Sequence, residues 1–177
     1  MSTTEKDIAS AVDAGGQHDH HEIPWIRRYV FAPDHKMIAK QFMFVSLFFL
    51  VVGGALAGMM RFQLGFPGQP MPGAGILPDA MMAPTPNGAI MLPEFYNSLV
   101  TMHGTIMIFF AIMPLLVGLF GNLLIPLQIG AEDMAFPRLN MASFWLAVPA
   151  GMLMLASFAV EGGAAGAGWT SYAPLST

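Results

Sequence analysis

The chain contains a long stretch without a charged side chain. No Lys, Arg, Asp or Glu occurs between Phe95 and Ala131, and a helix needs about 20 apolar residues to cross a bilayer. Two further uncharged runs cover residues 42–60 and 141–160. Because lipid satisfies no backbone hydrogen bond, runs of this length fold as helices there. We therefore predict an all-α membrane protein with three transmembrane helices.

The composition agrees with this class and excludes others. Of the 177 residues, 55% are hydrophobic and only 10% are charged, against about 25% charged in a soluble domain. There is no cysteine, which excludes disulfides, thiolate ligation of haem and zinc–thiolate sites. No basic cluster with interleaved aromatic residues is present, so we expect no nucleic-acid partner.

The uncharged runs and the segments between them define the expected organisation of the chain. The predicted parts are a disordered polar tail (residues 1–22), an interfacial basic segment (23–41), transmembrane helix 1 (42–61), an outer Pro/Gly loop (62–97), transmembrane helix 2 (98–129), an inner loop (130–140), transmembrane helix 3 (141–160) and an outer Gly-rich segment (161–177). Asp34 is a plausible N-cap for the first of these helices.

The tail contains a short His/acid tract, His18-Asp19-His20-His21-Glu22. Such a tract can bind a metal ion. The favoured interpretation is a solvated tail, because no rigid element fixes the geometry that a metal site needs.

Basic residues give the orientation. Arg27, Arg28, Lys36 and Lys40 precede the first span, whereas the loop over residues 62–97 contains no Lys or Arg. Since cytoplasmic loops carry the excess of basic residues, we expect a cytoplasmic N-terminus and an outer position for that loop.

His103 is the histidine that falls inside a predicted span. An ionisable residue there marks a candidate functional site, because its burial in hydrocarbon costs free energy. A packing role, a substrate or proton site in a transporter, and axial ligation of a haem iron all remain possible from the residues alone. We favour haem: Gly104 leaves the backbone beside the imidazole open, Met107 follows one turn later, and Arg61 is expected at a comparable depth.

Asp133 is the second candidate, at the inner end of the second span. Asn122 and Asn140 lie on either side of it in the sequence. An acid at the mouth of a bundle with amides nearby could start a chain of ordered waters that carries protons. From spacing alone, a solvated loop acid or an N-cap is the simpler interpretation.

The chain contains four separate motifs, RFQLG (61–65), TMHGTIMIFF (101–110), GNLLIPLQIGAEDMAFPRLN (121–140) and GAGWTSYAPL (166–175). These motifs resemble subunit I of the haem–copper oxidases, the cytochrome c oxidase type. They occur in the order of the family, and the resemblance extends from about Asp34 to the last residue.

The resemblance implies roles for individual residues. His103 matches the histidine that ligates low-spin haem a, and Arg61 matches the arginine that bonds the formyl group of that haem. Asp133 matches the acid at the entry of the D proton pathway. The remaining matches are the residues lining the haem pocket, a tryptophan near the haem propionates, and two pathway asparagines: Tyr96, Met107, Trp169, Asn122 and Asn140.

The sequence departs from the family pattern at two positions. Gln63 stands where the family often has an acid that helps to bind Ca or Na, and Met141 stands where a second asparagine often follows. The family has about twelve spans, so the resemblance implies an N-terminal portion or a split subunit. The second haem, copper and the second axial ligand of the low-spin haem would then be held by later spans.

The implied function is that of the N-terminal part of a terminal oxidase subunit, which reduces oxygen to water and pumps protons. It implies further partners: the remainder of subunit I or a completing chain, other oxidase subunits, and cytochrome c or a quinol as electron donor. The expected location is a bacterial inner membrane. The alternative is a non-catalytic three-helix accessory or transporter subunit, in which His103 packs or binds substrate.

Overall fold

The structure is a computed structural model that describes residues 24–73, 75, 81–160 and 163–174. The chain divides into two compact units, residues 1–32 and 33–177. The described part of the first unit contains the short helix α2 (Trp25–Tyr29), which buries no residue. The guanidinium of Arg28 lies over the ring of Tyr29, 5.6 Å from its centroid. The His/acid tract and the predicted tail lie outside the described residues.

The second unit contains three long helices that are apolar enough to cross a membrane. The first is α3 (His35–Gly65). The second runs from Pro93 to Ile129 and comprises α4 (Pro93–Thr105), η3 (Ile106–Ile112), η4 (Pro114–Gly121) and α5 (Asn122–Ile129). The third is α6 (Pro137–Ala156), which continues into the 3₁₀ turn η5 (Ser157–Ala159). The prediction of a mostly helical protein with three candidate spans is confirmed.

Local residues explain where these helices begin and end. The side chain of Asp34 accepts a hydrogen bond from the Lys36 N–H at 3.4 Å, as expected for an N-cap. Pro93 and Pro137 occupy first-turn positions, where a missing N–H costs no helical bond. Gly130 ends α5 with a φ of 70°, a left-handed conformation that glycine adopts readily.

All three helices begin before the spans predicted from uncharged runs, 42–61, 98–129 and 141–160, and the first also ends after its span. The helix α3 begins seven residues before that first span, at His35, and so includes Lys36 and Lys40. The uncharged run marks only the apolar centre of a helix, whereas the helical backbone continues through polar residues at its ends.

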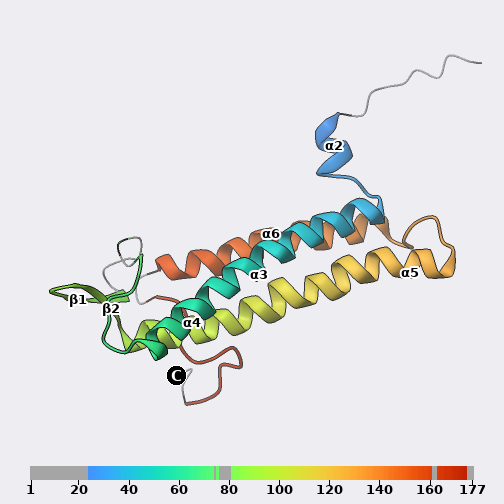
Figure 1. The fold of residues 1–177 in the computed structure, drawn as a ribbon. Coiled ribbons are helices and arrows are strands. Elements are labelled where there is room, and N and C mark those ends of the chain that lie inside the picture. Colours follow the sequence, from blue (N-terminus) through green and yellow to red (C-terminus); the bar gives the residue numbers. More distant parts are fainter. Residues whose placement is uncertain (1–23, 74, 76–80, 161–162, 175–177) are drawn as a thin grey trace, which may run out of the picture. The chain divides into compact units, whose positions relative to one another are not determined.

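The loop predicted over residues 62–97 contains a β-hairpin. Strands β1 (Met82–Thr85) and β2 (Gly88–Met91) pair antiparallel, with Met82 opposite Met91. The Met71 N–H also bonds to the Ala89 carbonyl. Figure 1 shows the hairpin beyond the start of α4, at one end of the helices; we call this the hairpin end. The opposite end, which includes the loop between α5 and α6, is the Asp133 end.

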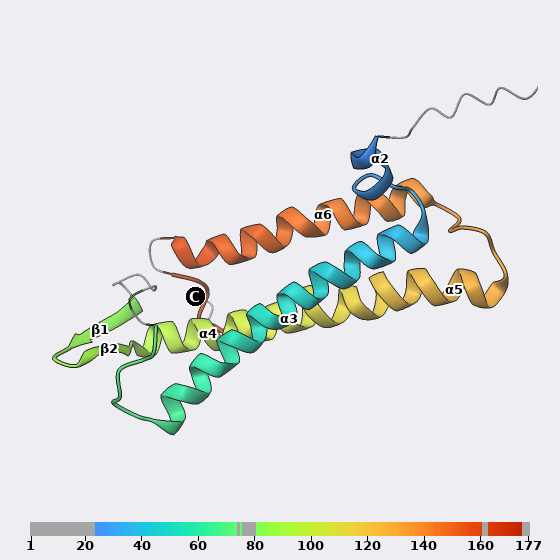
Figure 2. The ribbon, with the colours of Figure 1, turned by 45° about the horizontal axis from the view of Figure 1, so that its top comes forward.

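The helix α3 packs against both of the other long helices, as Figure 2 also shows. Three buried clusters follow one another along it. The hairpin-end cluster contains Met71, Met81, Met82, Met91, Phe95 and Leu99; the middle cluster contains Phe49, Met102, Ile106, Ala111 and Ala164; the Asp133-end cluster contains Ile38, Phe42 and Phe144. These clusters fix the faces of α4, η3 and α6 that meet α3.

Candidate functional site

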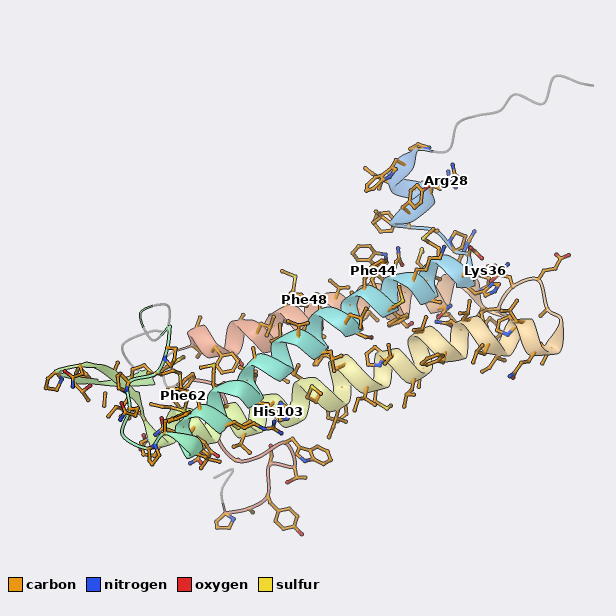
Figure 3. All side chains as sticks on the ribbon, viewed as in Figure 1. Arg28, Lys36, Phe44, Phe48, Phe62 and His103 are labelled. Carbon is orange, nitrogen blue, oxygen red and sulfur yellow. The ribbon has the colours of Figure 1, made fainter. Side chains whose placement is uncertain are left out.

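The His103 ring is oriented by the backbone of the neighbouring helix. Its Nδ1 lies 2.9 Å from the carbonyl oxygen of Gly53 on α3, and Figure 3 shows the side chain where α4 faces α3. Because a carbonyl only accepts hydrogen bonds, Nδ1 must carry the proton that it donates. The lone pair of a neutral imidazole then resides on Nε2, which is the usual arrangement of a metal-binding histidine.

Met107 approaches α3 at the same glycine. A Cβ built on Gly53 would lie 2.6 Å from the Met107 sulfur and 3.6 Å from Ile106 Cγ2. The absence of a side chain at Gly53 therefore lets α4 come close enough for His103 to reach the carbonyl. The sequence expectation that His103 and Met107 share a face is consistent with these contacts.

Gly104 does not leave an open surface beside the imidazole. A Cβ at Gly104 would meet the indole of Trp169 at 3.2–3.5 Å, and the Phe109 ring lies 6.3 Å from that indole between centroids. Adjacent residues on a helix point about 100° apart, so Gly104 and His103 face different neighbours. The expected role of Gly104 as space for a flat partner is therefore wrong: it is occupied by Trp169.

Arg61 and Tyr96 lie nearer the hairpin end than His103. Arg61 follows Gly53 by eight residues, about 12 Å along α3, and its side chain is exposed. Tyr96 precedes His103 by two turns on α4 and packs against the hairpin-end cluster. On α3 the imidazole thus meets the level of Gly53, and the backbone of Arg61 lies about two turns nearer the hairpin end.

The donor set fits the iron of a haem. His103 offers a neutral nitrogen whose tautomer is fixed by Gly53, and its side chain is only partly buried. Tyr96, His103 and Met107 project from one side of the same long helix, at spacings of seven and four residues. Their aromatic, imidazole and thioether groups suit the edge and axial position of a porphyrin.

Asp133 accepts hydrogen bonds from three donors. Its Oδ1 lies 2.7 Å from the Met134 N–H nitrogen, 3.3 Å from the His35 backbone nitrogen and 3.0 Å from His35 Nδ1. His35 is 1% exposed, whereas the Asp133 side chain is 39% exposed. Sequence reasoning missed His35 because it is 98 residues from Asp133, a separation that no local spacing could relate.

These donors determine the charge of the carboxyl. Partial burial acts to raise the pKa of Asp133, but the hydrogen bonds from Met134 and from the ring and backbone of His35 outweigh it. The pKa of Asp133 is consequently lowered from its ordinary value of 3.8. Asp133 is therefore ionised at neutral pH and holds the loop against the first turn of α3.

Asp34 lies beside this pair. One ligand atom each from Asp34, His35 and Asp133 lie within 4.8 Å of one another, a set that could hold a metal ion. The contact of 3.0 Å between His35 Nδ1 and Asp133 Oδ1 has the length of a hydrogen bond, which already explains why these groups are close.

The two asparagines predicted near Asp133 line one cavity. It measures about 380 Å³, and Met134, Ser143 and the Asp133-end residue Phe42 are among the other lining residues. Asn122 donates from Nδ2 to the Gly118 carbonyl at 2.8 Å, whereas Nδ2 of Asn140 is buried without a hydrogen-bond partner among the described residues. Asp133 itself does not line the cavity but immediately precedes Met134, which does.

Comparison with known proteins agrees with this arrangement. The family model described as cytochrome c and quinol oxidase polypeptide I matches residues 37–177. Cytochrome c oxidase subunit 1 of Thermostichus vulcanus is 44% identical over 153 residues, which cover 86% of this chain and 24% of the relative. That of Synechocystis sp. is 44% identical over 158 residues, covering 89% and 25%.

A relative of lower identity also matches most of this chain with a small part of its own length. The haem–copper oxidase subunit I+III of Aeropyrum pernix is 38% identical over 153 residues, 86% of this chain and 16% of the relative. The chain thus spans about a quarter or less of the length of these curated relatives. With the family model matched over most of its residues, this helical membrane chain belongs to the family of cytochrome c and quinol oxidase polypeptide I.

Proposed function

We propose that this chain is the N-terminal part of the catalytic subunit of a terminal respiratory oxidase. Its part would be to supply His103 as an axial ligand of low-spin haem a, and Asp133 as the entry for protons taken up from the cytoplasm. The observation that carries the haem assignment is the hydrogen bond from His103 Nδ1 to the Gly53 carbonyl. It leaves Nε2 free to bind iron, in a chain whose relatives are named as cytochrome c oxidases.

The residues around His103 would shape the haem pocket. Met107 and Gly53 set the distance between α3 and η3, while Tyr96 and Arg61 lie two turns toward the hairpin end, where they could meet the porphyrin substituents. Trp169 would close the side next to Gly104. A haem with two imidazole ligands has no open position for oxygen and so would transfer electrons.

At the other end, the ionised Asp133 would attract protons to the mouth of a polar path. The cavity beside Met134 has room for several waters, and Asn122, Asn140 and Ser143 line it with amide and hydroxyl groups. Asn140 lines the cavity, and its Nδ2 is buried without a hydrogen-bond partner among the described residues. Waters there could carry protons from Asp133 toward the centre of the subunit.

The assembled enzyme would reduce oxygen to water while pumping protons, with electrons from cytochrome c or a quinol. The second haem and copper would be held by the rest of subunit I, together with the other oxidase subunits. We place it in the bacterial inner membrane with a cytoplasmic N-terminus, because Lys36, Lys40 and Arg138 all lie near the Asp133 end.

The direct test is His103→Ala in the assembled oxidase. We expect the low-spin haem absorption to disappear and a pyridine haemochrome assay to count one haem fewer per enzyme. Thr105→Val on the same helix is the matched control, since the Thr105 hydroxyl bonds only to the Thr101 carbonyl of its own helix in the described structure. An unaltered low-spin spectrum in the His103→Ala enzyme would show that His103 is not a ligand of this haem.

A further inference from the structure

A segment distant in sequence from α4 is held against it by backbone and hydroxyl groups. We call the described residues 163–170 the strap; they follow α6 and η5 in the chain. The strap includes Ala164, which is 5% exposed and belongs to the middle cluster. Its last residues place Trp169 over Gly104, next to His103 in the sequence.

Two buried hydroxyl groups on α4 face the strap. Ser98 is 7% exposed and Thr101 is 4% exposed. Burying a hydroxyl without a hydrogen-bond partner costs free energy, so the partners of these groups show what they contribute. For both residues, one partner is the backbone of the strap.

The Thr101 hydroxyl both donates and accepts a hydrogen bond. It donates to the Asn97 carbonyl at 3.0 Å and accepts from the Gly168 N–H at 2.9 Å. A valine of the same shape could do neither, and it would leave the Gly168 N–H without this acceptor. Gly168 has a φ of 80°, a conformation that suits glycine and lets the chain turn at this point.

Ser98 forms the second attachment. Its hydroxyl lies 2.7 Å from the Ala164 carbonyl and 3.1 Å from the Glu94 carbonyl of its own helix. A hydroxyl has a single proton to donate, and the shorter of the two distances is to the strap. The strap is thus fixed at Ala164 and at Gly168, the residue directly before Trp169.

We propose that Ser98 and Thr101 are positioning residues, which clamp the strap onto α4 and thereby hold the indole of Trp169 beside the haem-ligating His103. The proposal rests on the proposed function of His103. Trp169 contacts Gly104 and pairs with the ring of Phe109, so its position is set by the part of the long helix that directly follows the histidine. A large aromatic group there would limit access of water to the edge of a haem bound at His103, and would so affect the spectrum and reduction potential of that haem.

The test uses Thr101→Val in the assembled oxidase, with two readouts. We expect the amide of Gly168 to exchange its hydrogen roughly tenfold faster, because its acceptor is lost. We also expect low-spin haem to remain bound, with a shifted absorption maximum and midpoint potential. Thr101→Ser keeps the hydroxyl and should restore both values. Thr105→Val, which removes a hydroxyl bonded within its own helix, should change neither.

A double variant separates positioning through Trp169 from a general disturbance of α4. If Thr101 acts through the indole, Thr101→Val should shift the haem spectrum when Trp169 is present. Added to Trp169→Phe, the same substitution should cause no further shift. Ser98→Ala should move the same readouts in the same direction, and it serves as the second variant if Thr101→Val does not assemble.

The outcomes distinguish this proposal from the haem assignment. Wild-type exchange at Gly168 in both Thr101→Val and Ser98→Ala would overturn the clamp. Faster exchange with an unshifted haem spectrum would overturn the positioning of Trp169. An unaltered low-spin spectrum in His103→Ala would instead refute the proposed function, whatever the exchange rate at Gly168.

Discussion

At the scale of single residues, the position of the Asp133 carboxylate depends on a histidine near the start of the second unit. Its carboxylate accepts from the ring and the backbone of His35 as well as from Met134. Nε2 of the buried His35 ring is without a partner among the described residues, so the ring is held through its other nitrogen. The position of the proposed proton entry therefore depends on α3 as much as on the loop that carries Asp133.

Replacing His35 tests this dependence. Donors to a carboxylate favour its ionised form, so His35→Leu should raise the pKa of Asp133 toward 3.8. His35→Asn keeps an N–H donor near the position of Nδ1 and should raise it less. The pKa can be followed as the pH dependence of the carboxyl infrared band, assigned as the band missing in Asp133→Asn. Equal pKa values in the Leu variant and the wild type would show that His35 does not stabilise the charge.

The same lowered pKa gives the sign of the pH effect. A carboxyl whose pKa is lower in the folded state adds stability that is present above its unfolded pKa, near 3.8. This contribution is lost as the pH falls through the folded pKa. The attachment of the Asp133 loop to α3 is thus expected to be complete at neutral pH and to weaken only in acid.

At the scale of elements, two glycines let α3 pack closely against its neighbours. The Phe42 ring occupies the space beside Gly118 of η4, and the Phe49 ring occupies the space beside Gly151 of α6. An added Cβ would lie 2.8 Å from Phe42 Cδ2 at Gly118 and 2.8 Å from Phe49 Cε2 at Gly151. A buried ring cannot turn aside as the end of a methionine can, so either contact would push the helices apart.

Gly118→Ala is therefore expected to destabilise the packing of α3 on η4 by about 1–3 kcal/mol. Thermal unfolding in detergent, followed by circular dichroism, measures the loss. Gly54→Ala is the matched control, because no atom of the described chain lies within 4 Å of a Cβ placed there. Equal losses of stability in the two variants would contradict the close contact between Phe42 and Gly118.

The sequence predicted the helices better than their contacts. Uncharged runs located the centres of α3, of α6 and of the helix from Pro93 to Ile129, because burial in lipid requires such runs. Gly53, Gly54 and Gly58 all lie on α3, yet among them only Gly53 has an atom within 4 Å of an added Cβ. Phe42 and Phe49 both lie on α3 and contact Gly118 and Gly151. Which glycine each ring contacts depends on how α3 crosses helices that are distant from it in the sequence.

In the candidate sites, too, the sequence predicted individual residues better than the contacts between them. His103 and Met107 could be chosen from a single helix, and Asn122 and Asn140 from the sequence on either side of Asp133. The hairpin, the placement of Trp169 over Gly104, and the contact of His35 with Asp133 could not. Each of these depends on residues that are brought together only by tertiary packing, for which spacing along the chain gives no measure.

At the scale of the whole molecule, much of the apolar surface of the second unit remains exposed. Leu146, Met152 and Leu153 of α6 are 72%, 66% and 73% exposed, and Val117 of η4 is 64% exposed. Side chains of this kind are stable against lipid or against further helices. The relatives are about four times longer, and under the proposed function the rest of subunit I would cover part of this surface.

Under the proposed function, the haem coordination of this chain alone should differ from that of the assembled subunit. In the described spans, His35 is bonded to Asp133 at one end, and His103 is the remaining histidine. One imidazole gives a high-spin haem, whereas two give a low-spin one. We therefore expect the isolated chain in detergent, mixed with haem, to show a high-spin absorption spectrum that added free imidazole converts to low-spin. His103→Ala should bind haem more weakly, as the control for non-specific association. A low-spin spectrum without added imidazole would mean that this chain alone holds both axial ligands, so that the second need not come from a later span.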